Sequence, residues 1–319
     1  MTRPWLSVIV PTRNGGPLVR RALDSVAAEG DDGVEVIAVD DGSTDETLAV
    51  LETCRRSLNL VIERRAVGNW VANTNLGLVR ASADLACFLH QDDSWLPGRL
   101  AAVRERLAGT RSAGLLLHAC QFVAADGRPV GRWTGPLPPH RPAMPAATVG
   151  HLLVQNFVGI PGAVFRRSLA LECGGLDESL WYTADWDFWL KLASSTDTIY
   201  LPRPLATFRV HAASLTATRS RSVPEFRDQL ESVFARHAAR WQEPDDSTRR
   251  SVERAARASI EINVALASAY HRLPFERGRL LSALGTLRPS DWARLWRDAR
   301  LRERIVSRLR AGFRPTPRG

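Results

Sequence analysis

The stretch LSVIVPTRN at residues 6–14, followed by VEVIAVDDGS at residues 34–43, decides the fold class of this chain. Each begins as a short, nearly unbroken run of apolar residues, which is typical of a strand covered on both faces. A helical pattern at 17–29 separates the two runs, and a second helical pattern follows at 44–56. This alternation predicts βαβ units and a mainly parallel sheet.

The alternation continues through LVIER, a third helix and LACFLH, and further strands are expected in AVFRR and ATFRVH. A helix is expected to start near Asp185, between these last two segments. After residue 219 only helical patterns remain. We therefore expect an α/β fold, with a Rossmann-like, mainly parallel mixed sheet in a domain spanning 1–219 and a basic helical extension at 220–319.

Each of the three principal strands ends in polar residues. The first runs into PTRN, the second into DDGS and the third into QDD at 91–93. In open α/β sheets ligands lie beyond the carboxyl ends of the strands, so these residues should gather at one edge. Adjacent carboxylates such as Asp92 and Asp93 repel each other unless a cation offsets them. The pattern predicts a divalent cation and a phosphorylated ligand, and no P-loop or dinucleotide-binding glycine motif is present.

Composition excludes several classes of protein. With 319 residues, 45% hydrophobic and 24% charged, the chain is neither disordered nor a disulfide-stapled miniprotein. The four cysteines are far apart without a C-x-x-C motif, so we expect reduced thiols and a cytoplasmic location. No apolar run reaches about eighteen residues, and no signal peptide is recognisable. Residues 220–319 hold 21 basic and 12 acidic side chains, which accounts for the whole net charge of +9.

Five motifs, in order, resemble the inverting family-2 glycosyltransferases, which use nucleotide sugars on the A-type glycosyltransferase fold. The resemblance covers about Ser7 to Leu215 and rests on SVIVPTRN, VIAVDDGSTDET, GNWVANTNLGLVRASADLACFLHQDDSWLPGRL, GAVFRRSLALECGGLDESLWYTADWDFWLKLA and PLATFRVHAASLT. It implies transfer of a sugar from a nucleotide diphosphate sugar to a hydroxyl of a glycan, a lipid-linked saccharide or a small molecule. The Q-x-x-R-W motif of processive synthases is absent, so the addition of one or a few sugars is expected.

The resemblance also assigns a binding site. It places these residues at the nucleotide sugar: Pro11, Arg13, Asp41, Asn75, Asp92 and Asp93. Asp41 would accept a hydrogen bond from the base or ribose, and Asp92 and His211 would bind Mn²⁺ or Mg²⁺ at the diphosphate. This chain departs from the family's commonest D-x-D-D pattern, because its first position is occupied by His90. This histidine is either a further metal ligand or a strand cap.

Asp185 matches the family's catalytic base. It opens a predicted helix, whose N-terminal dipole favours an ionised carboxylate, the form that can take a proton from an acceptor hydroxyl. The family usually has Glu just before this Asp, but this chain has Ala184, and Asp187 is the candidate replacement. The resemblance implies direct displacement with inversion at the anomeric carbon.

Four aromatic residues surround this position. Trp181 or Tyr182 is a candidate platform for an acceptor sugar ring, because aromatic faces suit the apolar faces of sugars. Trp186 and Trp189, which are three residues apart on the predicted helix, are expected in the core.

The segment 290–313 predicts one basic amphipathic helix with two tryptophans. Either it lies in an anionic membrane surface at the inner face of the membrane, or it packs on the catalytic domain or a partner subunit. Nucleic-acid binding is not expected, because no nucleic-acid motif is present. Two other functions remain open: a catalytically inactive sugar-nucleotide-binding or interaction protein, and a nucleotidyltransferase, which lacks support because its Gly-rich loop is absent.

Overall fold

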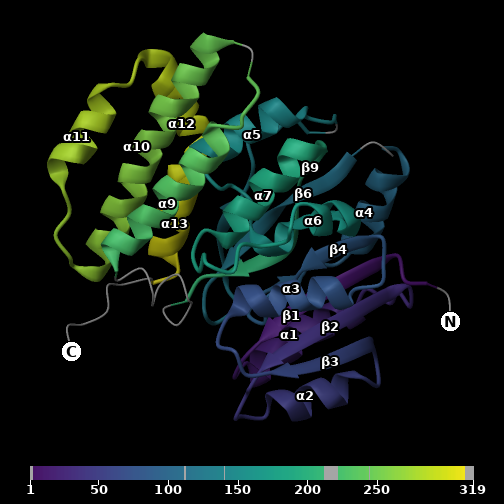
Figure 1. Ribbon diagram of the computed structural model, residues 1–319. Coiled ribbons are helices and arrows are strands. Elements are labelled where there is room, and N and C mark those ends of the chain that lie inside the picture. The colour runs from purple at the N-terminus through teal and green to yellow at the C-terminus, as the bar shows by residue number, and fades with distance from the viewer. Residues whose placement is uncertain (1–2, 111–112, 140, 212–221, 244, 313–319) are drawn as a thin grey trace.

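The chain folds around a mixed sheet, nine-stranded in the part that the computed structural model describes, namely residues 3–110, 113–139, 141–211, 222–243 and 245–312 (Figure 1). The strand order is β3-β2-β1-β4-β8-β6-β9-β5, and β7 pairs with β6. The strands are β1 (Leu6–Thr12), β2 (Val34–Asp41), β3 (Asn59–Arg65), β4 (Leu85–Phe88), β5 (Ser94–Trp95), β6 (Ala113–Val123), β7 (Pro129–Trp133), β8 (Ala163–Arg166) and β9 (Asp197–Arg209). The helices are α1 (Gly16–Ala27), α2 (Thr47–Cys54), α3 (Trp70–Arg80), α4 (Arg99–Ala108), α5 (Pro145–Val154), the 3₁₀ turn η1 (Ile160–Gly162), α6 (Arg167–Glu172), α7 (Ala184–Ser195), α9 (Val223–Ala238), α10 (Asp246–His271), α11 (Arg277–Gly285), α12 (Pro289–Ala299) and α13 (Leu301–Arg310).

The first half of the sheet is parallel and covered on both faces, as the sequence predicts. β1 pairs in parallel with β2 and β4, and β2 pairs in parallel with β3. Val8 and Val10 join a core cluster with residues of α1 and α2, whereas Ile9 joins the cluster that contains residues of α3. Successive side chains of a strand point to opposite faces, so this two-sided burial requires an uninterrupted apolar strand.

Helix α2 begins at Thr47, three residues after the expected start. The side chain of Asp45 accepts a hydrogen bond from the backbone N–H of Thr47 at 3.0 Å. The Ser43 hydroxyl accepts a hydrogen bond from the backbone N–H of Asn14 at 2.9 Å. Residues 43–46 therefore form a loop that is tied to the end of β1, where the candidate site lies.

The second half of the sheet mixes strand directions. β8 runs antiparallel to both β4 and β6, while β6 and β9 are parallel. Beneath it Phe88, Phe165, Phe188 and Trp189 pack together, with ring centroids between 5.0 and 6.0 Å apart. This aromatic cluster fixes α7 against the sheet. Trp189 and Trp186 are both buried, as expected.

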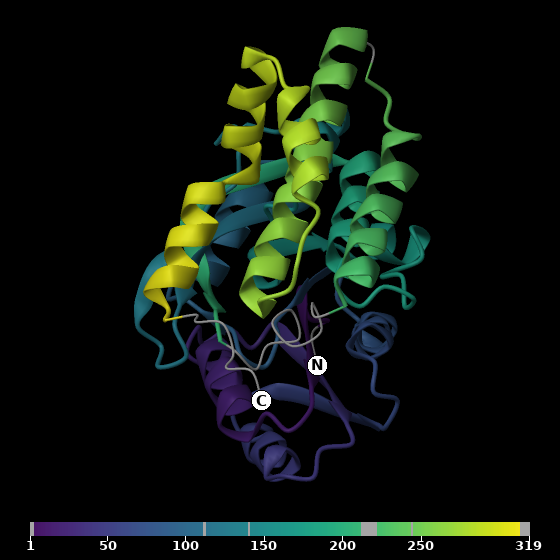
Figure 2. The same ribbon diagram turned by 90° about the vertical axis from the view of Figure 1, so that its left-hand side faces the viewer.

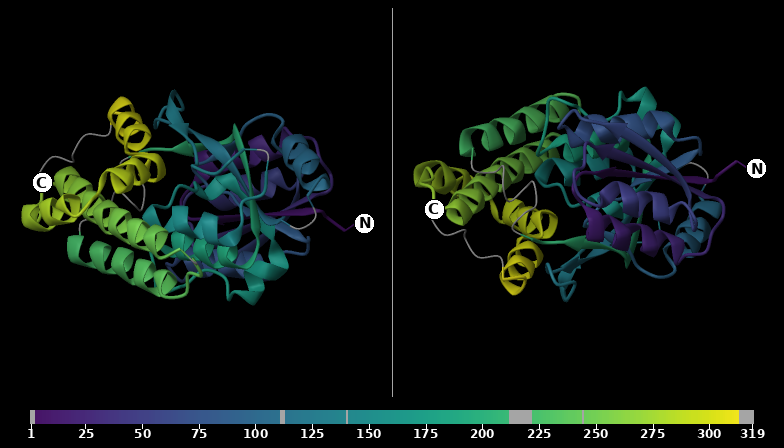
Figure 3. Two further views of the ribbon diagram at one scale, coloured as in Figure 1. Left: turned by 90° about the horizontal axis from the view of Figure 1, so that it is seen from above. Right: turned by 90° about the horizontal axis from the view of Figure 1, so that it is seen from below.

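Helices α9 to α13 gather on one side of the molecule, away from β3 and α2 (Figures 1 and 3). Phe226 of α9, Val252 of α10 and Leu295 of α12 belong to the same hydrophobic cluster as Leu152 of α5. The division of the chain at residue 219 stays a prediction, and the core is continuous across it. None of the helices in the described part of the chain has the length and apolar character needed to cross a membrane.

The single helix expected at 290–313 is wrong, because α12 and α13 are two helices. Arg300 between them adopts a left-handed conformation with φ of 48°. Its guanidinium donates hydrogen bonds to the carbonyls of Thr134 at 3.2 Å and Gly135 at 3.5 Å, so a long-range contact accompanies the bend. Figure 2 shows the two yellow helices, of which the lower, α13, packs on β7.

Candidate active site

The ends of β1, β2 and β4 meet at one edge of the sheet, as predicted. The side-chain oxygen of Gln91 accepts hydrogen bonds from the Thr12 hydroxyl at 2.6 Å and from the backbone N–H of Arg13 at 2.9 Å. Asn14, with φ of 46°, accepts a hydrogen bond from the backbone N–H of Thr44 at 2.8 Å. These contacts hold the three strand ends together.

Asp41 and Arg13 lie at this edge, next to the buried Pro11, and their assignment to the nucleoside stays a prediction. One oxygen of the nearly buried Asp41 carboxylate accepts hydrogen bonds from the backbone N–H groups of Val67 at 2.7 Å and Gly68 at 3.0 Å. The exposed Arg13 guanidinium approaches Gly68: its Nη1 is 3.8 Å from the position that a Cβ atom would take at that glycine. The pair therefore borders the 67–68 loop, with the second oxygen of Asp41 left for another donor.

Asn75 lies on α3 and is engaged with the loop before α7. Its amide group donates to the carbonyl of Leu176 and to the side chain of Glu178, both at 2.9 Å, and it accepts from the backbone N–H of Leu176 at 2.9 Å. Both N–H bonds are used, so Asn75 connects α3 to this loop. Its assignment to the nucleotide sugar stays a prediction.

Asp92 and His211 stand side by side. Nε2 of His211 is 2.9 Å from Oδ2 of Asp92. Asp93 is buried and accepts a hydrogen bond from the backbone N–H of Arg209 at 2.9 Å, and the Arg209 guanidinium donates to the carbonyl of Asp92 at the same distance. Arg209, at the end of β9, thus fixes the Asp93 carboxylate and the backbone of Asp92.

The pKa values of Asp92 and Asp93 are shifted in opposite directions. Burial opposes ionisation of Asp92, but the hydrogen bond with His211 and the charges of His90 and His211 outweigh it, so the pKa of Asp92 is lowered. Burial and the neighbouring charge of Asp92 raise the pKa of Asp93 well above its usual value. Asp92 therefore ionises more readily than its neighbour Asp93.

A carboxylate oxygen and an imidazole nitrogen at hydrogen-bond distance are a donor set that suits Mn²⁺. Among the described residues no group of three or more His, Cys, Asp or Glu side chains gathers to hold a metal. Asp92 and His211 would thus supply two ligands, and a diphosphate would supply further oxygens. His90 is half-buried, burial lowers its pKa, and its Nε2 has no hydrogen-bond partner among the described residues.

Trp70 connects His90 to the segment before α7. Its ring meets His90 edge-on, with centroids 5.2 Å apart. Its indole N–H donates to the carbonyl of Trp181 at 3.1 Å. Trp181 and Tyr182 are in turn held by α9, because the Trp181 indole donates to Glu225 and the backbone N–H of Tyr182 donates to the Gln229 side chain at 3.1 Å.

Asp185 is half-buried in the first turn of α7. One carboxylate oxygen accepts from the backbone N–H of Trp186 at 2.8 Å, and the other accepts from the Asn156 side chain at 3.0 Å. Burial raises the pKa of Asp185 to about 6, although these hydrogen bonds oppose the increase. A carboxyl group with a pKa near neutrality suits proton transfer.

Asn156 is a partner of Asp185 that the sequence patterns did not reveal. Asp187 does not replace the family's Glu that is missing at Ala184. Asp187 is fully buried and contacts Lys191 at 2.7 Å, His237 at 2.8 Å and Arg236 at 3.0 Å. Residues two apart on a helix face different sides. The idea that Asp187 supports Asp185 is therefore wrong. The polar pair Gln155-Asn156 between two apolar runs was the signal in the sequence.

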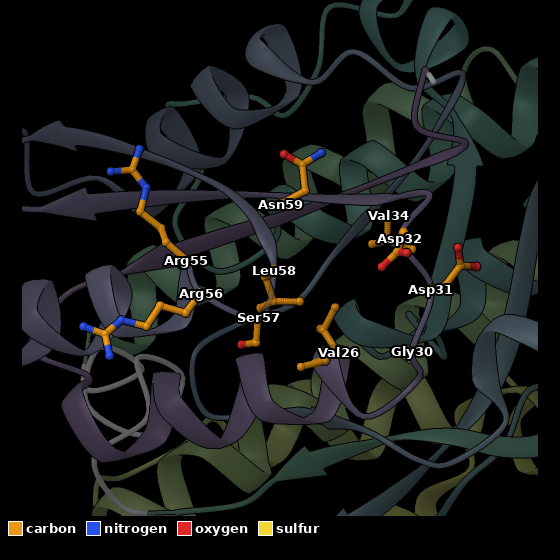
Figure 4. Close-up of a pocket in the computed structure, with 11 residues that line it drawn as sticks. Val26, Gly30, Asp31, Asp32, Val34, Arg55, Arg56, Ser57, Leu58 and Asn59 are labelled. Atoms are coloured by element: carbon orange, nitrogen blue, oxygen red, sulfur yellow. The ribbon is translucent and has the colours of Figure 1, made fainter. Parts of the chain in front are cut away.

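One pocket of the described structure lies away from this edge. It has a volume of about 340 Å³ and lies between the end of α1, the 30–34 loop and the start of β3. In Figure 4, Arg55 and Arg56 border one side, and Asp31 and Asp32 border the other. This pocket is at the amino ends of β2 and β3, opposite the edge where Asp41 lies, and we assign it no function.

Known proteins resemble this chain in sequence. The family model "Glycosyl transferase family 2" matches residues 7–138. The uncharacterized protein MT1568 of Mycobacterium tuberculosis (strain CDC 1551 / Oshkosh) is 30% identical over 226 residues, which is 68% of this chain and 70% of the relative. Other relatives carry the name of glycosyltransferases.

Solved structures share the fold. Residues 1–349 of S. aureus TarS, in complex with UDP-GlcNAc, match with a TM-score of 0.68 and 19% identity over 97% of this chain and 90% of that one. The mannosyltransferase PcManGT from Pyrobaculum calidifontis, in complex with GDP-Man and Mn²⁺, matches with a TM-score of 0.59 and 21% identity over 98% and 86%. The A-type glycosyltransferase fold is confirmed, and this chain is a glycosyltransferase that belongs to glycosyl transferase family 2.

Proposed function

We propose that this glycosyltransferase transfers a sugar from a nucleotide diphosphate sugar to an acceptor hydroxyl, non-processively, with inversion and with the help of a divalent cation. The observation that carries the proposal is Asp185, a half-buried carboxyl with a pKa of about 6. The segment just before it is tied to the metal ligand proposed at Asp92, because Trp70 donates to the carbonyl of Trp181 and packs against His90. A base and a diphosphate site are the two parts that direct displacement needs.

The donor class follows from the first half of the sheet. Asp41 and Arg13 offer an acceptor for a base or ribose and a cation for a phosphate. The likeness to structures that hold UDP-GlcNAc and GDP-Man supports a nucleoside diphosphate sugar as the ligand at this edge.

Asp92 and His211 are the residues that would hold Mn²⁺ or Mg²⁺. Bound there, the cation supplies positive charge to a diphosphate leaving group. The Mn²⁺ in the PcManGT complex supports this assignment. The backbone of Arg209 fixes Asp93, which keeps the ionised Asp92 at the end of β4 available to the cation.

Asp185 accepts the proton of the acceptor hydroxyl. The acceptor oxygen forms a bond to the anomeric carbon from the side opposite the nucleotide, and the bond from that carbon to the diphosphate oxygen breaks, with its electron pair leaving on the diphosphate. Asn156 orients Asp185 and stabilises its ionised form through one hydrogen bond. A single displacement of this kind inverts the anomeric configuration.

Thermal unfolding across a panel of UDP, dTDP and GDP and their sugars tests the donor and metal assignments. A ligand that binds only the folded state raises the melting temperature in proportion to its occupancy. We expect a Mn²⁺-dependent increase with one nucleotide that is lost in Asp92→Ala and kept in Asp84→Ala, an exposed control. No increase with any nucleotide, from folded protein, would support the interaction-protein alternative.

A second proposal concerns α12 and α13, which we infer contact an anionic membrane surface peripherally. Trp292, Trp296 and Leu309 are 46%, 65% and 69% exposed, respectively, among the arginines of these helices. Tryptophan and arginine together suit the interface of an anionic bilayer. The acceptor would then be a saccharide carried by a lipid.

A further inference from the structure

Arg304 and Arg308 form an unusual pair on the inner face of α13. They are one helical turn apart, so their side chains share a face. Arg304 is only 8% exposed and Arg308 is half-buried. The Arg308 guanidinium donates to the Arg304 carbonyl at 3.2 Å, and the Arg304 guanidinium donates to the Asn263 side chain at 2.7 Å.

No carboxylate among the described residues pairs with either arginine, and the remaining residues of the chain contain no Asp or Glu. Neighbouring arginines differ, because Arg254 pairs with Asp291 at 2.6 Å and Arg297 pairs with Asp298 at 2.7 Å. Burial, together with the charge of Arg308, lowers the pKa of Arg304 to about 10. Two like charges at one largely buried site are costly unless an anion joins them.

The pair is connected to the catalytic base by a chain of hydrogen bonds. Asn263, which accepts from Arg304, donates to the side-chain oxygen of Gln155 at 2.8 Å. The Gln155 amide donates to the carbonyl of Asn156 at 3.3 Å, and Asn156 donates to Asp185 at 3.0 Å. Helix α13 therefore extends one side of the site that contains Asp185.

Tyr182 is near enough to both the arginine pair and Asp185 to be affected by their charges. The charges of Arg304, Arg308 and Asp185 all act on its hydroxyl, whose pKa is raised chiefly by burial. Its ring packs on Phe226 with centroids 4.4 Å apart, so the ring is fixed. Arg99 is a different case: it also lacks a carboxylate partner, but it is fully enclosed over Trp95, whereas a ligand can reach the half-buried Arg308.

We propose that Arg304 and Arg308 bind a phosphate group of the acceptor, so that this enzyme glycosylates a hydroxyl on a phosphate-bearing molecule. The inference rests on the proposed function, with Asp185 as the base. The phosphate belongs either to a water-soluble sugar phosphate or polyol phosphate, or to a lipid-linked phosphate. Guanidinium groups suit this ligand because their N–H donors match phosphate oxygens.

The first test is calorimetric titration of the full chain with inorganic phosphate, in the presence of the nucleoside diphosphate and Mn²⁺ so that the donor site is filled. We expect Arg308→Gln to weaken phosphate binding at least tenfold. Arg302→Gln, an exposed position on the same helix, should bind phosphate as the wild type does. Equal binding by the two variants, each shown by its melting curve to be folded, would overturn the proposal.

The second test is transfer to matched acceptors: mannose 6-phosphate against mannose, glycerol 3-phosphate against glycerol, and phosphatidylglycerol vesicles against phosphatidylcholine vesicles. We expect kcat/KM at least tenfold higher with the phosphate-bearing soluble acceptors or with the anionic vesicles, which identifies the source of the phosphate. Arg308→Gln should abolish this preference without changing KM for the donor. A higher donor KM in Arg308→Gln with an unchanged preference would assign the pair to the donor instead and overturn the proposal.

These results separate the two proposals. Loss of nucleotide binding by the wild type would contradict the proposed function. Normal nucleotide binding and transfer with no preference for phosphate-bearing acceptors would contradict only the inference about Arg304 and Arg308.

Discussion

At the scale of the residue, the pKa of Asp185 predicts how activity depends on pH. The carboxyl must be ionised to accept a proton, and its pKa is about 6. We therefore expect kcat/KM for donor turnover to rise with pH and to level off above about pH 6 to 7. A profile that is flat from pH 5 to 8 would show that another group accepts the proton.

Asn156→Ala tests the partner of Asp185. The variant removes a hydrogen bond that stabilises the ionised carboxylate, so the rising part of the pH profile should move to higher pH and turnover at pH 6 should fall several-fold. Asn59→Ala, at an exposed position at the start of β3, should keep the wild-type profile. An unshifted profile in Asn156→Ala would limit Asn156 to a structural role.

The same pKa has an opposite effect on stability. Because the folded-state pKa of Asp185 is about 6, above the ordinary 3.8, folding favours the protonated form. This contribution is complete below about pH 4 and is lost as pH rises through 6. Urea unfolding should show Asp185→Asn gaining stability relative to the wild type as pH increases from 4 to 7.

Single residues differed in how well the sequence predicted them. Asp41, Asp92 and Asp93 follow buried strands, so their positions at one edge follow from strand direction alone. Asn156 lies in an irregular segment, and its contact with Asp185 depends on how α5 packs against α7, which no local pattern encodes.

At the scale of the element, Asp187 joins α7 to α9. Its contacts with Arg236 and His237 connect α7, which carries the proposed base Asp185, to a helix that lies beyond residue 219. The pKa of Asp187 is lowered to about 2, because hydrogen bonds from His237 and Lys191 outweigh the effect of burial. A depressed carboxyl pKa gives stability that is present above about pH 4 and lost as pH falls through 2.

Asp187→Ala should therefore reduce the free energy of unfolding by about 3–5 kcal/mol, because it removes a fully buried carboxylate and leaves Lys191 without its ion-pair partner. Urea unfolding at pH 7 measures this loss. Asp246→Ala, an exposed carboxylate at the start of α10, should change the free energy of unfolding by less than about 1 kcal/mol. Similar values for the two variants would contradict the role of Asp187 as a link between the helices.

Helices α12 and α13 show why one element was predicted wrongly. The apolar spacing across residues 290–313 fits a continuous helix, and Arg300 has no intrinsic preference for the left-handed conformation. Its hydrogen bonds to residues 134–135, distant in sequence, accompany the bend. Local periodicity carries no information about such a contact.

At the scale of the whole molecule, the exposed tryptophans of α12 predict membrane binding. The wild type should sediment with phosphatidylglycerol vesicles and much less with phosphatidylcholine vesicles. Replacing Trp292 and Trp296 by Ser should reduce sedimentation at least tenfold, whereas Met144→Ser, which is 68% exposed elsewhere, should not. Equal sedimentation of all three proteins would favour contact with a partner subunit.

The α/β architecture was predictable as a whole, because strands β1, β2 and β4 and helix α3 follow from apolar runs and periodicity. What sequence patterns did not show is that α9 and α10 contribute to the surroundings of Asp185. Gln229 of α9 and Asn263 of α10 contact residues beside the base through tertiary packing.

The anomeric configuration of the first product tests the central claim most directly. Water can replace the acceptor, so the sugar released from UDP-GlcNAc or GDP-mannose, both α-linked, can be followed by NMR before it mutarotates. We predict the β anomer as the initial product, a reduction in rate of about 10²- to 10⁴-fold in Asp185→Asn, and unchanged donor binding by that variant. Release of the α anomer, or an unchanged rate in Asp185→Asn, would contradict direct displacement with Asp185 as the base.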